Sequence, residues 1–183
     1  MNRLLLLGRL FATCSCAFIS SCVMRETPKT PPATKPLHSA ADLVGTYVEG
    51  GEAYGRNGST SISRYLIKDT RLYAQEFRVS IPASGSLRFD AMSGSTVKAT
   101  RLLKEGKDYE IKDGWVVIDS RFYNPGDYVD SGTIGAGSQQ SSLRLTPDGR
   151  AIVRREQGGS TGLILLIPYA SISDNYVVHK RVK

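Results

Sequence analysis

The residue types that most often carry catalysis are scarce in this chain. It has only two histidines among 183 residues, His38 in a proline-rich stretch and His179 near the C-terminus. With His179 as the one histidine of the predicted folded domain, and with no cysteine after position 22, the sequence predicts no histidine-based triad and no zinc site. Asp119, Asp127 and Asp130 could offer oxygen ligands to calcium, but their spacing matches no standard loop and a turn is the preferred interpretation. The sequence therefore predicts no metal site and no cofactor.

Two short serine patterns resemble motifs of the penicillin-interacting serine enzymes. Ser95 and Lys98 fit Ser-x-x-Lys, and residues 173–175 read Ser-Asp-Asn. Those enzymes place the nucleophile at the start of a helix and follow it with a Lys-Thr-Gly strand in a much larger domain. Here Ser95 lies between predicted strands, so we interpret both patterns as chance matches. The glycine-rich residues 131–138 likewise lack the Gly-Lys-Ser/Thr ending of a phosphate loop. We predict that the chain is not an enzyme.

Cys22 follows an apolar stretch, and the residues before it, Ile19-Ser20-Ser21, resemble the lipobox of bacterial lipoproteins. Arg3 and Arg9 give this leader a positive start, and its apolar region is too short to span a bilayer. The resemblance implies that residues 1–21 are a signal peptide and that Cys22 receives a diacylglycerol and a fatty acid such as palmitate. The alternatives are an ordinary secretory leader, or lipidation at Cys14 or Cys16.

All three cysteines lie at or before the proposed cleavage point, so the mature domain would contain no disulfide. Several acyl chains on Cys22, each methylene contributing about 0.8 kcal/mol when buried, would make membrane attachment effectively permanent. Val23 occupies the position where an aspartate often marks retention at the inner membrane. We therefore expect a lipid-anchored protein of the cell envelope, at the periplasmic face of the outer membrane if the host has two membranes.

Residues 22–42 are rich in proline and threonine, with Pro28, Pro31, Pro32 and Pro36 in quick succession. Such a composition favours polyproline II, at about 3.1 Å per residue, and predicts a tether of roughly 50 to 60 Å. A proline-rich ligand for a partner is the alternative. Residues 43–183 then form one β domain.

Turn chemistry predicts the strands of this domain. Asp113-Gly114 supplies the positive backbone angles of a two-residue hairpin turn between strands 109–112 and 115–118. Pro147-Asp148-Gly149 predicts a second hairpin that leads into strand 151–156. We expect Gly158-Gly159 to reverse the chain again.

A buried strand is then expected at 163–167, with Pro168 ending its ladder, and a last strand runs to the C-terminus. The meander from Ser141 onward is the firmest structural prediction.

Apolar and polar residues alternate in the earlier segments, which predicts one inward and one solvated face. Tyr73, Phe77 and Val79 share a face, and Leu87 and Phe89 alternate with polar neighbours. We predict an all-β fold, an antiparallel meander that closes into a small β-barrel of about eight to ten strands, because closure removes exposed edges. A β-sandwich is the alternative.

The stretch Leu43-Val44-Gly45-Thr46-Tyr47 resembles the Gly-x-Trp entrance strand of lipocalins, with Tyr47 in place of tryptophan. The resemblance implies a barrel that holds a small apolar molecule. Four aromatic residues are then expected to line its interior, or merely to fill a core: Tyr47, Tyr73, Phe77 and Phe89.

Three function classes follow. The first is a non-enzymatic binding or structural lipoprotein that could carry a small apolar ligand. The second is a protein-interaction module, an inhibitor or envelope-assembly accessory, that uses a glycine-rich loop at 128–140, including Tyr128, Ser131, Gly135 and Gly137. An enzyme is the third.

The charge distribution argues against a nucleic-acid partner. Removing the two arginines of the leader lowers the formal net charge from +7 to +5. The basic residues are spread along strands, apart from the pair Arg154-Arg155 and a terminal group at 179–183, and solvated strand faces explain most of them. No basic helix or RNA-binding aromatic motif is present in the sequence.

Overall fold

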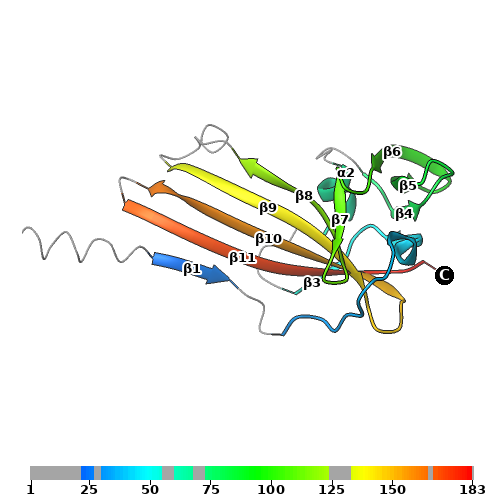
Figure 1. Cartoon of the computed structure of the whole chain (residues 1–183), viewed down its shortest axis with the longest axis horizontal. Helices are drawn as coiled ribbons and strands as arrows, with labels where there is room; N and C mark the ends of the chain where they lie inside the picture. Colours follow the sequence, from blue (N-terminus) through cyan, green and yellow to red (C-terminus); the bar gives the residue numbers. More distant parts are fainter. Residues whose placement is uncertain are drawn as a thin grey trace, which may run out of the picture.

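The computed structural model describes residues 22–26, 30–54, 60–67, 73–123, 133–164 and 167–182. These residues form two β-sheets, one short α-helix and one 3-10 helix (Figure 1). The elements and their bounds are β1 (Cys22–Glu26), η1 (Ala40–Leu43), β2 (Gly45–Val48), β3 (Glu52–Tyr54), α2 (Ile62–Ile67), β4 (Glu76–Ser80), β5 (Leu87–Ser93), β6 (Thr96–Leu103), β7 (Tyr109–Lys112), β8 (Trp115–Tyr123), β9 (Thr133–Leu145), β10 (Ala151–Ile164) and β11 (Ile167–Lys180).

The larger sheet has seven strands in the order β1-β11-β10-β9-β8-β7, and β3 also pairs with β11. All its pairings are antiparallel except the one between β1 and β11, which is parallel. Strands β9, β10 and β11 have 13 or 14 residues each. They are long enough to run well past the smaller sheet, so one half of the large sheet belongs to the compact body and the other half projects from it (Figure 1).

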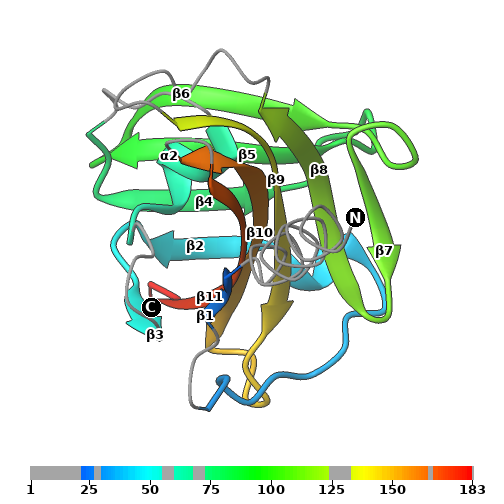
Figure 2. The same ribbon diagram turned by 90° about the vertical axis from the view of Figure 1, so that its left-hand side faces the viewer.

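The smaller sheet has the order β2-β4-β5-β6. Its strands run across those of the larger sheet, and helix α2 lies beside it (Figure 2). The alternation of apolar residues along β4 and β5 points Phe77, Val79, Leu87 and Phe89 inward, and all four are essentially inaccessible to solvent. They pack against Leu143 and other buried residues of the large sheet, and this cluster is the hydrophobic core.

The predicted barrel is wrong, and the sandwich alternative describes the fold. Neither sheet closes on itself. A single bridge, Tyr47 to Arg181, links the edge of the small sheet to the chain just after β11. On the other side β6 and β7, both fully described, are connected by a turn and form no ladder with each other. The described residues form eleven strands in two layers, seven in the large sheet and four in the small one, rather than eight to ten strands in one barrel.

Both predicted hairpins are confirmed. Asp113 and Gly114 have φ angles of 50° and 71°, and they join β7 to β8 in the expected register, with Lys112 opposite Trp115. Residues 147–149 join β9 to β10, and Gly149 has φ 71°. The left-handed conformation of these turn residues explains why Asp-Gly and Gly are found there.

The predicted reversal at Gly158-Gly159 is wrong, because both glycines lie inside β10 and are paired on either side. The chain instead reverses between Ile164 and Ile167, which are paired with each other. Pro168 is therefore the second residue of β11 and does not end a strand. It precedes Tyr169, where the pairing with β1 starts, so its missing N–H is not needed on that edge.

The described part of the segment predicted to be a tether contacts the sandwich. The Lys35 N–H donates to the Leu145 carbonyl at 2.9 Å, and the Leu37 N–H donates to the Gly114 carbonyl at 2.9 Å. Leu37 and Ala40 are buried in the core. Residues 22–26 form β1, so the described parts of the segment lie along the sandwich and its large sheet rather than forming an extended spacer.

Candidate functional site

Three of the four aromatic residues predicted to line an interior lie together in the core. Tyr47, Phe77 and Phe89 are each 0% exposed, and the rings of Phe77 and Phe89 stack with centroids 5.2 Å apart. The Tyr47 hydroxyl donates to the Leu43 carbonyl and accepts from Arg181, both at 2.8 Å. Burial raises the pKa of Tyr47, and the hydrogen bond from Arg181 opposes this. These side chains fill the space between the two sheets.

Tyr73 was grouped with Phe77 on one face, and this grouping is wrong. Tyr73 is 85% exposed. It lies three residues before β4 begins, outside the regular alternation of the strand, so counting in steps of two does not predict its direction.

The predicted interaction loop falls only partly within the described chain. Tyr128 and Ser131 lie outside the described residues. Gly135 and Gly137 are part of β9, where they pair with Gly162 and Ser160 of β10. The stretch from 133 to 140 is therefore strand, not loop, and it belongs to the projecting half of the large sheet.

The predicted lipidation site, Cys22, begins β1. The backbone of β1 pairs in parallel with β11, from Cys22 opposite Tyr169 to Glu26 opposite Ser173. Tyr169 is the third residue of β11, so it lies close to the reversal between β10 and β11. Cys22 is thus placed at the end of the large sheet that lies farthest from the small sheet (Figure 1).

A cluster of charged and polar side chains lies buried between β10, β11 and the segment around α2. The Arg154 guanidinium is completely buried, and it approaches the Glu156 carboxylate at 2.9 Å. Arg154 Nη1 also donates to the Ser61 carbonyl at 2.9 Å. The Glu49 carboxylate, only 7% exposed, accepts from three donors: the hydroxyls of Ser61 and Ser63, each at 2.5 Å, and the Ser63 N–H at 3.0 Å.

His179 completes this cluster. Its side chain is fully buried, and its Nδ1 lies 3.2 Å from the Val48 carbonyl. Burial, together with the positive charge of Arg154, lowers the pKa of His179 to about 3. Gly51 packs directly against the ring, since a Cβ there would lie 2.8 Å from His179 Cε1. His179 is therefore neutral at neutral pH.

The chemistry of this cluster is structural. Its carboxylates and guanidinium are out of contact with solvent, and its hydrogen bonds join residues distant in the sequence, such as Arg154 and Ser61. Burying charges is unfavourable unless they are paired, so each member constrains the positions of the others. The cluster fixes the α2 segment against the large sheet.

The sequence contains a signal for this cluster. The pair Arg154-Arg155 stands apart from the basic residues spread along the strands, and the structure shows that Arg154 is buried. Ile152, Arg154 and Glu156 alternate along β10, so the two charged residues share the inward face of a core isoleucine. Val177 and His179 do the same on β11. Charged residues in step with core residues indicate a buried pair.

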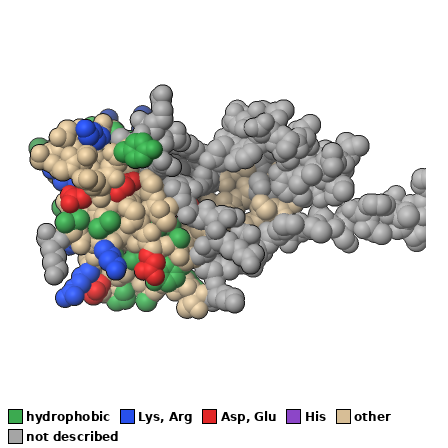
Figure 3. All heavy atoms as spheres, turned by 180° about the vertical axis from the view of Figure 1, so that it is seen from behind, with side chains coloured by type: hydrophobic (Ala, Val, Ile, Leu, Met, Phe, Trp, Pro, Cys, Tyr) green, Lys and Arg blue, Asp and Glu red, His purple; other side chains and the backbone are tan. Residues whose placement is uncertain are grey.

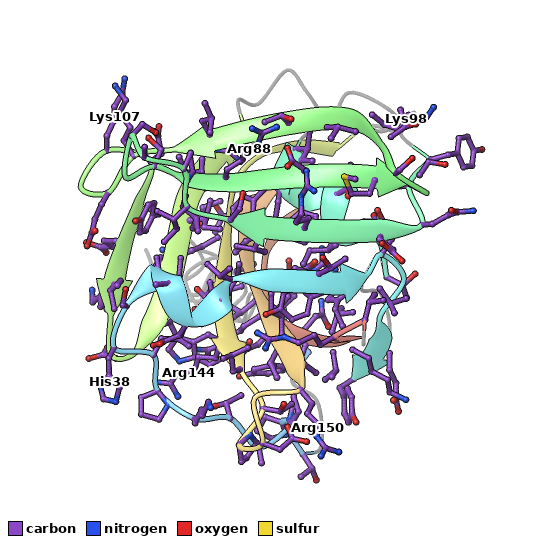
Figure 4. The ribbon with its side chains drawn as sticks, turned by 90° about the vertical axis from the view of Figure 1, so that its right-hand side faces the viewer. His38, Arg88, Lys98, Lys107, Arg144 and Arg150 are labelled. Carbon is purple, nitrogen blue, oxygen red and sulfur yellow. The ribbon has the colours of Figure 1, made fainter. Side chains whose placement is uncertain are left out.

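A second ionic group lies on the outer face of the small sheet. Asp90 is fully buried beneath Arg78 and Arg88, which approach its carboxylate at 3.0 and 2.8 Å, and Thr100 donates to it at 2.6 Å. Burial raises the pKa of Asp90, but the hydrogen bonds from Thr100 and the two arginines outweigh it and leave the pKa below its usual range. Figure 4 shows Arg88 on this face.

A row of aromatic and cationic side chains crosses the large sheet near the edge of the sandwich. The Arg144 guanidinium lies 4.5 Å from the centre of the Trp115 ring, and Arg155 lies 5.7 Å from that of Tyr176. Arg155 also donates twice to Asp174, at 2.9 and 2.7 Å. This hydrogen bonding raises the pKa of Arg155. This row marks the limit of the charged residues along β10 and β11.

The remaining charges form no single basic patch on the described surface. The labelled basic residues of Figure 4 lie apart: Arg88 lies on the outer face of the small sheet, Lys98 and Lys107 lie toward its two upper corners, and the other three labelled residues lie below it. Figure 3 shows acidic and basic side chains interspersed on the face of the compact body seen from behind the view of Figure 1. Of the terminal basic group, His179 is buried and Arg181 contacts Tyr47, so it is not a free cationic tail up to that point.

Other sequence patterns can now be placed. Ser95 lies in the turn between β5 and β6, and residues 173–175 lie in β11. Within the described ranges, no group of three or more His, Cys, Asp or Glu side chains could hold a metal ion. The part of the chain that the structure describes also has no helix with the length and apolarity needed to cross a membrane.

Comparisons with protein-family models, curated proteins and solved structures found no match to this chain.

Proposed function

We propose that this protein is a lipoprotein of the cell envelope, anchored to a membrane through Cys22, whose β-sandwich has a non-enzymatic structural or binding role. One observation carries the proposal: the residue that the sequence marks for lipidation is paired to the outermost part of the large sheet. An anchor at that place leaves the sandwich free of the bilayer.

The separation can be estimated from the strand. Cys22 is opposite Tyr169, whereas the sandwich begins near Tyr176, which pairs with Tyr54 of β3. The seven steps along the strand from Tyr169 to Tyr176 correspond to about 24 Å at about 3.4 Å per residue. A lipid attached at Cys22 would then enter the bilayer at one end of the sheet, with the small sheet at the other.

The packing of the interior favours the structural form of the proposal over carriage of a small apolar ligand. Tyr47, Phe77 and Phe89 are fully buried members of the hydrophobic core. A binding role would then use an outer surface of the molecule. If the host has two membranes, Val23 after the lipidated cysteine favours the periplasmic face of the outer membrane.

The test is metabolic labelling with an alkyne-bearing palmitate in a bacterial host. We expect the wild-type chain to be labelled and recovered in the membrane fraction, and the variant Cys22→Ser to lose the label. Cys14→Ser and Cys16→Ser are matched controls that should retain it, because both positions belong to the removed leader. An unlabelled wild-type chain, or a label that survives Cys22→Ser, would overturn the proposal.

A further inference from the structure

The projecting half of the large sheet ends in a region without charged residues. We define the far end as the residues of β9, β10, β11 and β1 that lie beyond the row formed by Gly159 and Ile172. Every residue of the far end is apolar, glycine or an uncharged polar residue, in a chain of which 22% is charged. The far end comprises Thr133–Gly137, Ser160–Ile164, Ile167–Ser171 and Cys22–Met24.

The most apolar part of the far end is the hairpin of β10 and β11. Leu163 pairs with Pro168, and Ile164 pairs with Ile167, so all four of these paired positions carry apolar residue types. Tyr169 follows, opposite Cys22 on β1. The register thus brings the predicted lipidation site and the apolar hairpin to the same edge of one sheet.

We propose that this hairpin is a second membrane contact, which enters the interfacial region of the bilayer beside the lipidated Cys22. The inference rests on the proposed lipidation, because the acyl chains fix which end of the sheet meets the membrane. An uncharged surface can be buried among lipid headgroups and acyl chains without the large penalty of desolvating ions. Tyrosine, an amphipathic residue, is enriched at this depth.

The placement of charges sets how far the sheet enters. On β1 the first charged residue is Arg25, opposite Ile172, and on β11 it is Asp174, which is bound to Arg155. The connection between β8 and β9 carries Asp127 and Asp130 in its sequence. The contact is therefore assigned to the hairpin of β10 and β11, and it stops before the Ile172 row.

Such a contact gives the sheet a defined orientation. A lipid on a single cysteine leaves a protein free to rotate about its anchor, whereas two adjacent attachments on neighbouring strands align the sheet with the membrane normal. The proposal therefore assigns to the hairpin an orienting function that acylation alone does not provide.

The test uses the mature chain from residue 22, with Cys22→Ser and an ordinary secretory leader, so that no acyl chain is present. Binding to vesicles of phosphatidylethanolamine and phosphatidylglycerol is measured by co-sedimentation in about 0.5 M NaCl, which screens attraction between the basic chain and anionic lipid. The hairpin variant carries Ile164→Asp and Ile167→Asp. Its matched control is Ile81→Asp, at a 37% exposed isoleucine next to the small sheet.

We expect salt-resistant binding of the unlipidated chain, a loss of about fivefold or more in the hairpin variant, and less than twofold in the control. Near-ultraviolet circular dichroism of Trp115 checks that each variant is folded. A lack of wild-type binding, or equal binding by both variants, would overturn the inference. So would loss of self-association in the hairpin variant, measured by sedimentation velocity, without loss of vesicle binding, because the hairpin would then join copies of the chain. The result is independent of palmitate labelling, so each proposal can fail alone.

Discussion

The two halves of the large sheet are built from the same three long strands, but they differ in the residues that these strands carry. In the sandwich half, β10 and β11 bury Arg154, Glu156 and His179 against core residues, and Arg155 is bound to Asp174 at its border. In the far end, the same strands carry no charge and have no second sheet packed against them (Figure 1). One half is distinguished by its buried ion pair, and the other by its lack of charged residues.

The contrast shows why strand continuity does not imply a common environment. A strand that crosses from a sandwich into an uncovered sheet keeps its hydrogen-bonded ladder, because the neighbouring strands continue with it. What differs between the two halves is the residue types that the strand carries. Partners are required where charges are buried, whereas the far end needs a surface that can meet an apolar or interfacial environment.

Loss of the buried ion pair of the sandwich half, Arg154 with Glu156, should have the largest effect on the free energy of unfolding. Replacing Arg154 with methionine leaves the Glu156 carboxylate buried beside an apolar side chain. Breaking a buried ion pair from one side typically costs about 3 to 5 kcal/mol. We expect a decrease of that size in the free energy of unfolding, measured by urea denaturation of the mature chain.

The matched control is Ile172. Its side chain is 51% exposed, and it lies in the row next to the far end. The variant Ile172→Ala should change the free energy of unfolding by less than about 0.5 kcal/mol, as exposed substitutions usually do. Similar losses in the two variants would remove the distinction between the halves.

The protonation of His179 should make the stability of the sandwich half depend on pH. The pKa is about 3 in the folded chain and 6.5 when unfolded, so between these values the unfolded state binds a proton that the folded state does not. Stability is therefore complete above pH 6.5 and falls as the pH decreases. From pH 6.5 to pH 4.5 the loss should be about 2 kcal/mol.

Urea denaturation at a series of pH values measures this dependence. The variant His179→Gln should lose most of the slope over that range, whereas His38→Gln, at an exposed position, should keep it. Asp42, Asp90 and Asp148 have lowered pKa values, so their stabilisation is present at neutral pH and is lost mainly as the pH falls below about 4, where carboxylates of the unfolded chain take up protons. A wild-type stability that is flat from pH 6.5 to pH 4.5 would contradict the neutral, buried histidine.

The sequence predicted local structure well where a single turn determined it. Asp113-Gly114 specified both a conformation and a register, and the structure has both. Gly158-Gly159 was misleading because glycine also fits a strand whose neighbours come close. A Cβ at Gly158 would lie 2.8 Å from the Ser173 hydroxyl.

What the sequence could not predict depends on partners distant in the chain. Closure into a barrel is decided by how far two sheets overlap, and alternation is the same in a barrel and in a sandwich. The burial of Arg154 required knowing that Ser61, 93 positions away, lies beside it. The pairing of Cys22 with Tyr169 joins the two ends of the chain, and no local pattern predicts it.

The central claim is that the two halves of the large sheet face different surroundings, the far end the membrane and the sandwich water. The most direct test is fluorescence quenching by brominated lipids, with the lipidated chain reconstituted in vesicles. The chain has a single tryptophan, Trp115, in the sandwich half. A second protein, Trp115→Phe with Ile164→Trp, moves the fluorophore to the far end. We predict strong quenching of the second protein and little quenching of Trp115; equal quenching, or stronger quenching of Trp115, would contradict the account.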